Sequence, residues 1–153
     1  MEAPRSEPAY DLRRQAALNV LAAADANELR RLWDGWAEKP EVHPVRGPET
    51  GLVMLRGRTG GGGAPFNLGE ATVTRATVRL ATGEIGHGYC LGRDHDKSRT
   101  IAILDALFQR EPARVEAEVL APLRAAALAA DAKRRAETAA TKVDFFTMVR
   151  GED

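Results

Sequence analysis

Residues 49–80 read ETGLVMLRGRTGGGGAPFNLGEATVTRATVRL, and this stretch decides the fold class. Two runs rich in Val, Leu and Thr, residues 52–58 and 71–80, flank four consecutive glycines. Such runs on either side of a glycine loop are typical of paired strands. A short turn then leads into a third predicted strand, residues 84–91. Because tight connections join antiparallel strands, the stretch predicts an antiparallel meander of about three or four strands.

The segments on both sides of these strands predict helices. Leu29, Leu32, Trp33 and Trp36 follow the i, i+3, i+4, i+7 spacing of an amphipathic helix. The predicted helices start at Asp11, at Asp25 and Asp96 as N-caps, and at about Ala113. In the last helix, which is alanine-rich, Pro122 either causes a kink or opens a second segment at its first turn.

This order of elements predicts one α+β domain over residues 10–142, a small antiparallel sheet flanked by N-terminal and C-terminal helices. Residues 1–9 are charged and contain two prolines, so we expect a disordered lead-in. Residues 143–153 form a short C-terminal tail after the long helix, and we expect a docking role for it.

Composition excludes several classes of function. The chain has 22 basic and 22 acidic residues among 153, so its overall field is weak, and non-specific binding to nucleic acid or membranes is not expected. No apolar run approaches the length of a membrane span or a signal peptide. The single cysteine, Cys90, allows neither an internal disulfide nor a multi-cysteine zinc site. A cytoplasmic protein is expected.

The glycine loop has two possible roles. Bare backbone N–H groups, such as those of Gly61 and Gly62, can approach a phosphate closely. However, the loop lacks the Lys and Ser or Thr that follow a Walker-type loop, and a strand rather than a helix comes next. A flexible hairpin loop that binds nothing is therefore the alternative.

Arginines form the second candidate site, because guanidinium suits bidentate recognition of phosphate or carboxylate. The candidates on the two strands are Arg56, Arg58, Arg75 and Arg79. If their strand faces coincide in one sheet, the four guanidiniums should converge, with Arg93 at the edge of the same patch. The alternative is a solvated sheet face, or ion pairs with Glu70 and Glu84.

Other polar residues give little support for chemistry. His87 and Cys90 should point to opposite strand faces, so they cannot chelate one metal ion together. A cluster of Asp94, His95 and Asp96 is explained more simply by helix capping, and no metal site is predicted. Asp105 is either a perturbed acid or base, or a boundary residue that reaches water. Cys90 shares its strand face with two glycines, which favours a small buried residue over a reactive thiolate.

The tail gives the clearest signal for a partner. Its apolar side chains are Phe145, Phe146, Met148 and Val149. Aromatic residues and Met are enriched at interface cores. The tail therefore either docks on a partner or folds back onto the chain's own sheet.

Several of these segments resemble one small family. They are Glu49 to Val53, Thr72-Val73-Thr74-Arg75, Gly92-Arg93-Asp94 and Val143 to Gly151. Together they resemble the G subunit (PhnG) of the carbon–phosphorus lyase core complex, which belongs to bacterial phosphonate degradation. Without the resemblance, the alternative hypothesis is a stand-alone α+β protein that binds a small phosphonate or phosphate.

The resemblance implies partners and a reaction. The other core members are the H, I and J proteins, and in that family the G, H and I proteins act with the L protein. They replace the adenine of ATP by methylphosphonate, which gives ribose 1-methylphosphonate 5-triphosphate. The I protein resembles a purine nucleosidase, so the resemblance places adenine loss on that partner. MgATP would be a substrate of the assembled complex, this chain alone would bind no cofactor, and its catalytic residues remain unassigned.

Overall fold

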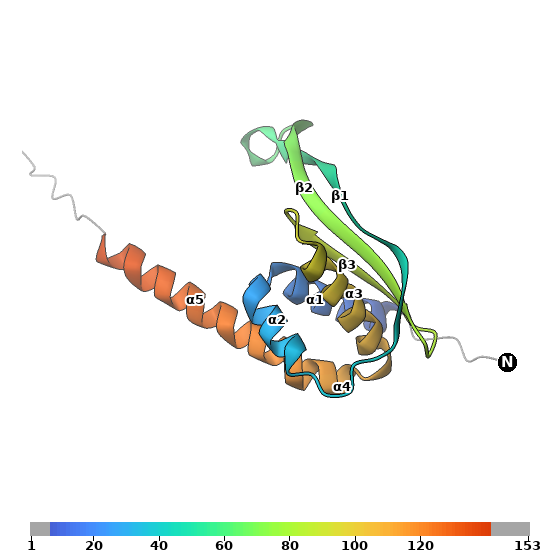
Figure 1. The fold of residues 1–153 in the computed structure, drawn as a ribbon. Helices are drawn as coiled ribbons and strands as arrows, with labels where there is room; N and C mark the ends of the chain where they lie inside the picture. Colours follow the sequence, from blue (N-terminus) through green and yellow to red (C-terminus); the bar gives the residue numbers. More distant parts are fainter. Residues whose placement is uncertain (1–6, 142–153) are drawn as a thin grey trace, which may run out of the picture.

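The computed structural model describes residues 7–141, with side chains from Leu12 onward, and has helices on one face of a three-stranded sheet (Figure 1). The helices are α1 (Glu7–Ala23), α2 (Ala26–Asp34), α3 (His95–Arg110), α4 (Pro112–Val115) and α5 (Ala121–Ala140). The strands are β1 (Val42–Arg58), β2 (Pro65–Leu80) and β3 (Ile85–Leu91). A 3₁₀ turn at Thr59–Gly61 joins β1 to β2, and a π-helical turn at Glu116–Leu120 joins α4 to α5. The α+β prediction is confirmed.

The sheet is an antiparallel meander in the order β1-β2-β3. Its first two strands are longer than predicted, since β1 begins at Val42 rather than Leu52 and β2 begins at Pro65 rather than Ala71. Prolines and glycines hide the alternation there, and register shifts after Pro44 and after Arg46 interrupt the pairing of β1 with β2. The result is a long two-stranded hairpin that extends past the helical layer (Figure 1).

The pleat of β2 assigns its faces as the sequence predicts. Ala76, Val78 and Leu80 are buried toward the helices, whereas Arg75 and Arg79 are exposed on the opposite face. We call this opposite side, which carries Arg75 and Arg79, the outer face. The buried residues of β2 pack with the apolar side of α3 in one core.

Helix α3 lies unusually close to β3. A Cβ atom added to Gly86 would lie 1.9 Å from the carbonyl oxygen of Ala102, and one added to Gly88 would lie 1.8 Å from that of Ser98. The prediction that Cys90 and these glycines lie buried against another backbone is therefore confirmed. Burial also raises the pKa of the Cys90 thiol, which makes it a poor nucleophile.

Two N-caps were predicted, and one is correct. Asp25 accepts hydrogen bonds from the backbone N–H groups of Asn27 and Glu28, at 3.0 and 3.1 Å. The cap of α3 is Asp94, which accepts from the N–H of Lys97 at 2.8 Å, so the prediction of Asp96 was wrong. Helix α1 also begins at Glu7, earlier than the predicted Asp11.

Asp105 is neither an exposed boundary residue nor a free acid or base. It is only 1% exposed and accepts from Arg14 on α1 through both oxygens, at 2.8 and 2.7 Å. The backbone N–H of His87 donates a third bond at 2.8 Å. This buried ion pair therefore connects α1, β3 and α3.

The predicted long helix is interrupted before Pro122. The N–H of Ala121 bonds to the carbonyl of Glu116, five residues back, which widens this turn into π geometry. Proline has no N–H and is well placed in the first turn of a helix, so Pro122 opens α5, one of the two predicted alternatives. Beyond Leu123, α5 is largely exposed and extends away from the core (Figure 1). No described helix has the length and hydropathy needed to cross a membrane.

Candidate functional site

Segments distant in the sequence meet where β1 and β2 adjoin the turn between β3 and α3. Thr74 is fully buried, and its hydroxyl donates to the carbonyl of Gly92 at 2.6 Å. The Thr50 hydroxyl lies 3.1 Å from that of Thr74 and 3.1 Å from Nε2 of His95. These contacts fix the turn relative to both strands, so three of the segments behind the family resemblance form one structural unit.

A cavity of about 260 Å³ lies over this unit on the outer face. The lining residues are Glu49, Thr50, Gly51, Leu52, Val53, Val73, Arg75 and Tyr89. Val73 is only 5% exposed, while the half-exposed ring of Tyr89 stands on the neighbouring strand. The cavity thus combines apolar groups with one guanidinium, one carboxylate and one phenol.

Charge in this cavity is organised around Glu49. Its carboxylate Oε1 lies 2.6 Å from Nε of Arg75 and 2.7 Å from Nε of Arg46. The hydrogen bond from Arg75 holds the pKa of Glu49 below its usual value, and the charge of Arg46 acts in the same direction. Two guanidiniums share one carboxylate, so the cluster is net positive. Arg75 is paired with Glu49 rather than with the predicted Glu70 or Glu84.

The four strand arginines do not converge, and that prediction is wrong. Arg75 pairs in register with Glu49, whereas Arg56 lies seven residues farther along β1 and faces Asn67. At roughly 3.3 Å per residue, the two arginines are about 23 Å apart along the strand. Arg79 lies still farther from Arg56, opposite His43. The hairpin is simply too long for one site to include all four.

The glycine loop is an exposed turn. Gly60 and Gly61 have φ of 58° and 79°, values that favour glycine, and Gly63 donates its N–H to the carbonyl of Thr59 at 2.8 Å. Arg58 donates to the Gly63 carbonyl at 3.3 Å. Turn geometry thus accounts for Gly60 and Gly61, while Gly62 is also exposed with free space around it. The possible phosphate-binding role of Gly61 and Gly62 stays a prediction.

The remaining predicted residues lie apart from the cavity. Arg93 is exposed in the turn that follows β3 and does not line the cavity. Among residues 7–141, no three His, Cys, Asp or Glu side chains gather closely enough to hold a metal ion. Phe145, Phe146, Met148 and Val149 lie outside the described residues, so their docking role also stays a prediction.

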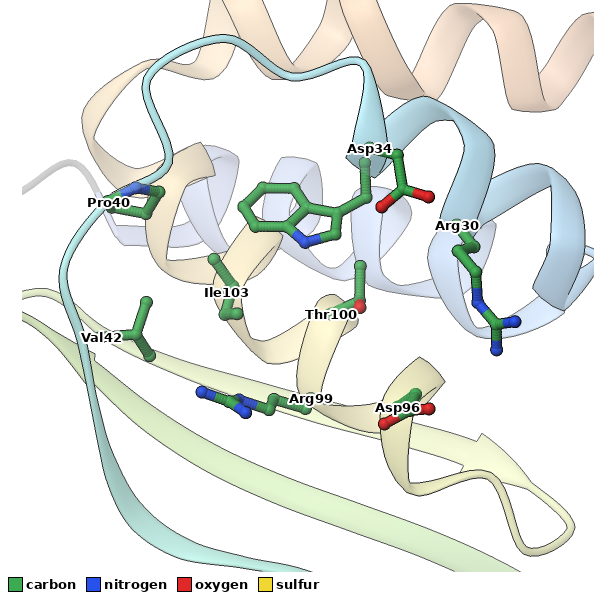
Figure 2. Close-up of a pocket in the computed structure, with 9 residues that line it drawn as sticks. Arg30, Asp34, Pro40, Val42, Asp96, Arg99, Thr100 and Ile103 are labelled. Atoms are coloured by element: carbon green, nitrogen blue, oxygen red, sulfur yellow. The ribbon is translucent and has the colours of Figure 1, made fainter.

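A second, more open cavity of about 470 Å³ lies between α2, α3 and the start of β1 (Figure 2). Arg30 and Arg99 extend toward different ends of it, and Trp33, Asp34 and Asp96 also line it. Lys39 lies 4.2 Å above the Trp33 ring. Because acidic and basic side chains balance and the two guanidiniums diverge, this cavity has no single anion-binding focus.

Sequence reasoning missed Glu49 and Tyr89. The partner of Arg75 depends on the register between β1 and β2, which the sequence does not give. Tyr89 carried a weaker signal, because alternation along β3 places it on the face opposite Gly88 and Cys90. That alternation alone assigns it to the outer face.

These residues define a class: a small α+β protein with an open sheet face and a cavity beside two arginines that share one carboxylate. Its described part has no cluster of His, Cys, Asp or Glu side chains that could hold a metal ion. The chain belongs to the family described as phosphonate metabolism protein PhnG, whose model matches residues 12–151. The family resemblance inferred from the sequence is therefore confirmed. One curated relative is the alpha-D-ribose 1-methylphosphonate 5-triphosphate synthase subunit PhnG of Rhizobium meliloti (strain 1021). It is 59% identical over 152 residues, which cover 99% of this chain and 97% of the relative.

Proposed function

We propose that this protein is a subunit of an alpha-D-ribose 1-methylphosphonate 5-triphosphate synthase in phosphonate degradation. The observation that carries the proposal is the 59% identity to a subunit of that name over nearly the whole of both chains.

The proposed partners are the H, I and J subunits of the carbon–phosphorus lyase core complex, the I subunit most directly, together with the L protein. Adenine loss would occur on the I subunit, and this chain would help direct the ribosyl group to methylphosphonate rather than to water. MgATP would be a substrate of the assembled complex, which we place in the cytoplasm.

Reconstitution tests this proposal. The H, I and L proteins should convert ATP and methylphosphonate to ribose 1-methylphosphonate 5-triphosphate only when this chain is added, as measured by ³¹P NMR and adenine release. The chain alone should release no adenine. Full product formation without the chain would refute the proposal. Tight binding of methylphosphonate by the chain alone would favour a stand-alone binding protein.

Arg75 is proposed to act on ligand rather than on folding. Arg75→Ala should lower product formation by the reconstituted complex. The reason is that the cavity loses the guanidinium that the Glu49 carboxylate holds in position. The melting temperature of the free chain should barely change, because both partners are partly exposed and such pairs contribute about 0–1 kcal/mol. Arg79→Ala is the matched control on the same face, since Arg79 does not line the cavity. Activity lost equally in both variants, or in neither, would contradict a specific role for Arg75.

The C-terminal tail is proposed to dock on the I subunit. Removing residues 143–153 should leave a folded core, since the described residues between Ala17 and Leu123 already form a continuous apolar core. Co-purification with the I subunit should fall sharply, because truncating one buried aromatic anchor commonly costs about 2 kcal/mol or more. Phe145→Ala and Phe146→Ala should then have different effects. One variant should lower the melting temperature of the free chain, and the other should lower only co-purification with the I subunit. Undiminished co-purification of the truncated chain would contradict this role.

A further inference from the structure

Within the part of the chain that the structure describes, no layer covers half of the β1–β2 hairpin. Strand β3 pairs only with residues 73–79 of β2, so the hairpin continues alone from there to its loop. In Figure 1 this part extends beyond α3 and the other helices. A two-stranded ribbon is only marginally stable in water by itself. This half of the hairpin is therefore expected to pack against, or pair with, another part of an assembly.

Both faces of the uncovered half carry exposed apolar side chains. Leu52 and Met54, on the side of the sheet that faces the helices, are 62% and 54% exposed. Leu55 is 42% exposed on the outer face. A strand with one solvated face usually alternates apolar and polar residues, whereas a strand that is apolar on both faces is typical of a sheet covered on both sides. The composition therefore fits a hairpin that is covered by another chain.

The free edge of β1 has the backbone groups that a neighbouring strand requires. The N–H of Gly92 bonds to the carbonyl of Thr72 at 2.8 Å, so the backbone groups of Thr72 point toward β3. Alternate residues of an antiparallel strand point to opposite edges. The groups of Ala71 therefore face its partner Val53 on β1. It follows that the N–H and C=O groups of Leu52 and Met54 point away from β2.

Only part of this edge is regular enough for pairing. Register shifts near Pro44 and Arg46 interrupt its first half, and another lies between Leu55 and Arg56. Bulges and prolines of this kind block pairing at sheet edges. The segment from Glu49 to Leu55 has an unbroken register with β2, so it is the available template.

We propose that an extended segment of another subunit of the synthase adds as a β-strand to the outer edge of β1 along Glu49–Leu55. This inference rests on the proposed function. The added segment would carry apolar side chains on both faces, no proline, and an acidic residue near Arg56. Arg56 has no ion-pair partner among the described residues and lies just past the template, so a carboxylate there is complementary.

A second copy of this chain is a poorer occupant. If two β1 edges paired antiparallel about Leu52, the register would bring Arg58 of each copy close to Arg46 of the other. Like charges directly opposite each other destabilise a strand pair. A different chain with an acidic residue avoids this repulsion.

Amide hydrogen exchange on the full chain, free and in complex with the other synthase subunits, tests the proposal. The amides of Leu52 and Met54 should exchange rapidly in the free chain and at least about 100-fold more slowly in the complex. The amide of Val53 faces β2 and serves as the internal reference, with protection already in the free chain. If a partner contacted only the side chains of β1 and added no strand, the amides of Leu52 and Met54 would stay unprotected in the complex.

Two pairs of variants give an independent readout. Leu52→Pro removes an N–H that makes no bond within the hairpin, whereas Leu52→Ala removes only the side chain, so the proline should weaken assembly by at least about tenfold more. Met54→Lys should also weaken assembly, because lysine at a strand edge opposes pairing. Its matched control is Leu128→Lys on α5, a leucine 71% exposed and distant from the hairpin.

The outcomes separate this inference from the function on which it rests. If the wild-type chain joins no complex with the other subunits, the proposed function fails, and this inference fails with it. If the complex forms but the Leu52 and Met54 amides exchange as in the free chain, strand addition is wrong and the function stands. Protection of these amides in a dimer of the free chain would assign the edge to a second copy and overturn the proposal.

Discussion

Gly88→Ala should destabilise the protein more than any other single-methyl change described here. The new Cβ would lie 1.8 Å from the carbonyl oxygen of Ser98 and 2.8 Å from the amide nitrogen of Ala102, both backbone atoms of α3. Neither atom can move without shifting the helix, and α3 supplies more buried apolar residues than any other described helix or strand. We expect a loss of more than about 3 kcal/mol in the free energy of unfolding. For a chain of this size, that corresponds to a fall in Tm of about 10 °C.

The matched control is Gly62→Ala in the hairpin loop. A Cβ at Gly62 would meet no atom within 4 Å, and its φ of −121° suits any residue. We expect a change within about 0.5 kcal/mol, as for other exposed substitutions. Denaturant unfolding followed by circular dichroism measures both variants. A Gly88→Ala protein as stable as the wild type would mean that α3 does not lie this close to β3.

Asp105→Ala should cost about 3–5 kcal/mol, the second large effect. The carboxylate is 1% exposed and accepts two bonds from Arg14 and one from the N–H of His87. Its removal leaves the partly buried guanidinium of Arg14 and the backbone N–H of His87 without this acceptor. Thermal unfolding of the free chain measures the loss, and Asp105→Asn should recover part of it, because an amide oxygen can still accept one bond.

Asp131→Ala provides the comparison for this ion pair. Asp131 also bonds to an arginine, Arg135, at 2.7 Å, but its side chain is 42% exposed on the projecting part of α5. Exposed pairs one helical turn apart contribute about 0.3–0.5 kcal/mol. Equal effects at Asp105 and Asp131 would show that burial does not set the strength of the Arg14 pair.

Local patterns predicted the elements and their faces, because alternation and helical spacing depend only on near neighbours. The pleat of β2 was assigned correctly from Ala76, Val78 and Leu80, and the burial of Cys90 followed from the two glycines on its strand face. The cap of α3 was misplaced by two residues, since Asp94 and Asp96 are both good capping residues. Sequence alone does not decide which of the two begins the helix.

The candidate site was predicted only in part, because it depends on register. Convergence of Arg56 with Arg75 required a short hairpin, yet β1 and β2 pair from Val42 to Arg58. The role of Asp105 was missed for a similar reason. Its partner Arg14 lies 91 positions away in the sequence, beyond the reach of any periodicity. Such contacts are properties of the assembled fold.

That separation also sets an order of events while the chain is being made. Ribosomes add about 5–20 residues per second, so Arg14 leaves the ribosome about 5–20 s before Asp105 does. During this interval α1 lacks both its ion-pair partner and the α3 surface on which it packs. The β-meander is composed of near neighbours and can pair first. Helix α1 is therefore made well before the helix that holds it, and newly made chains depend on the arrival of α3 to fix α1 in place.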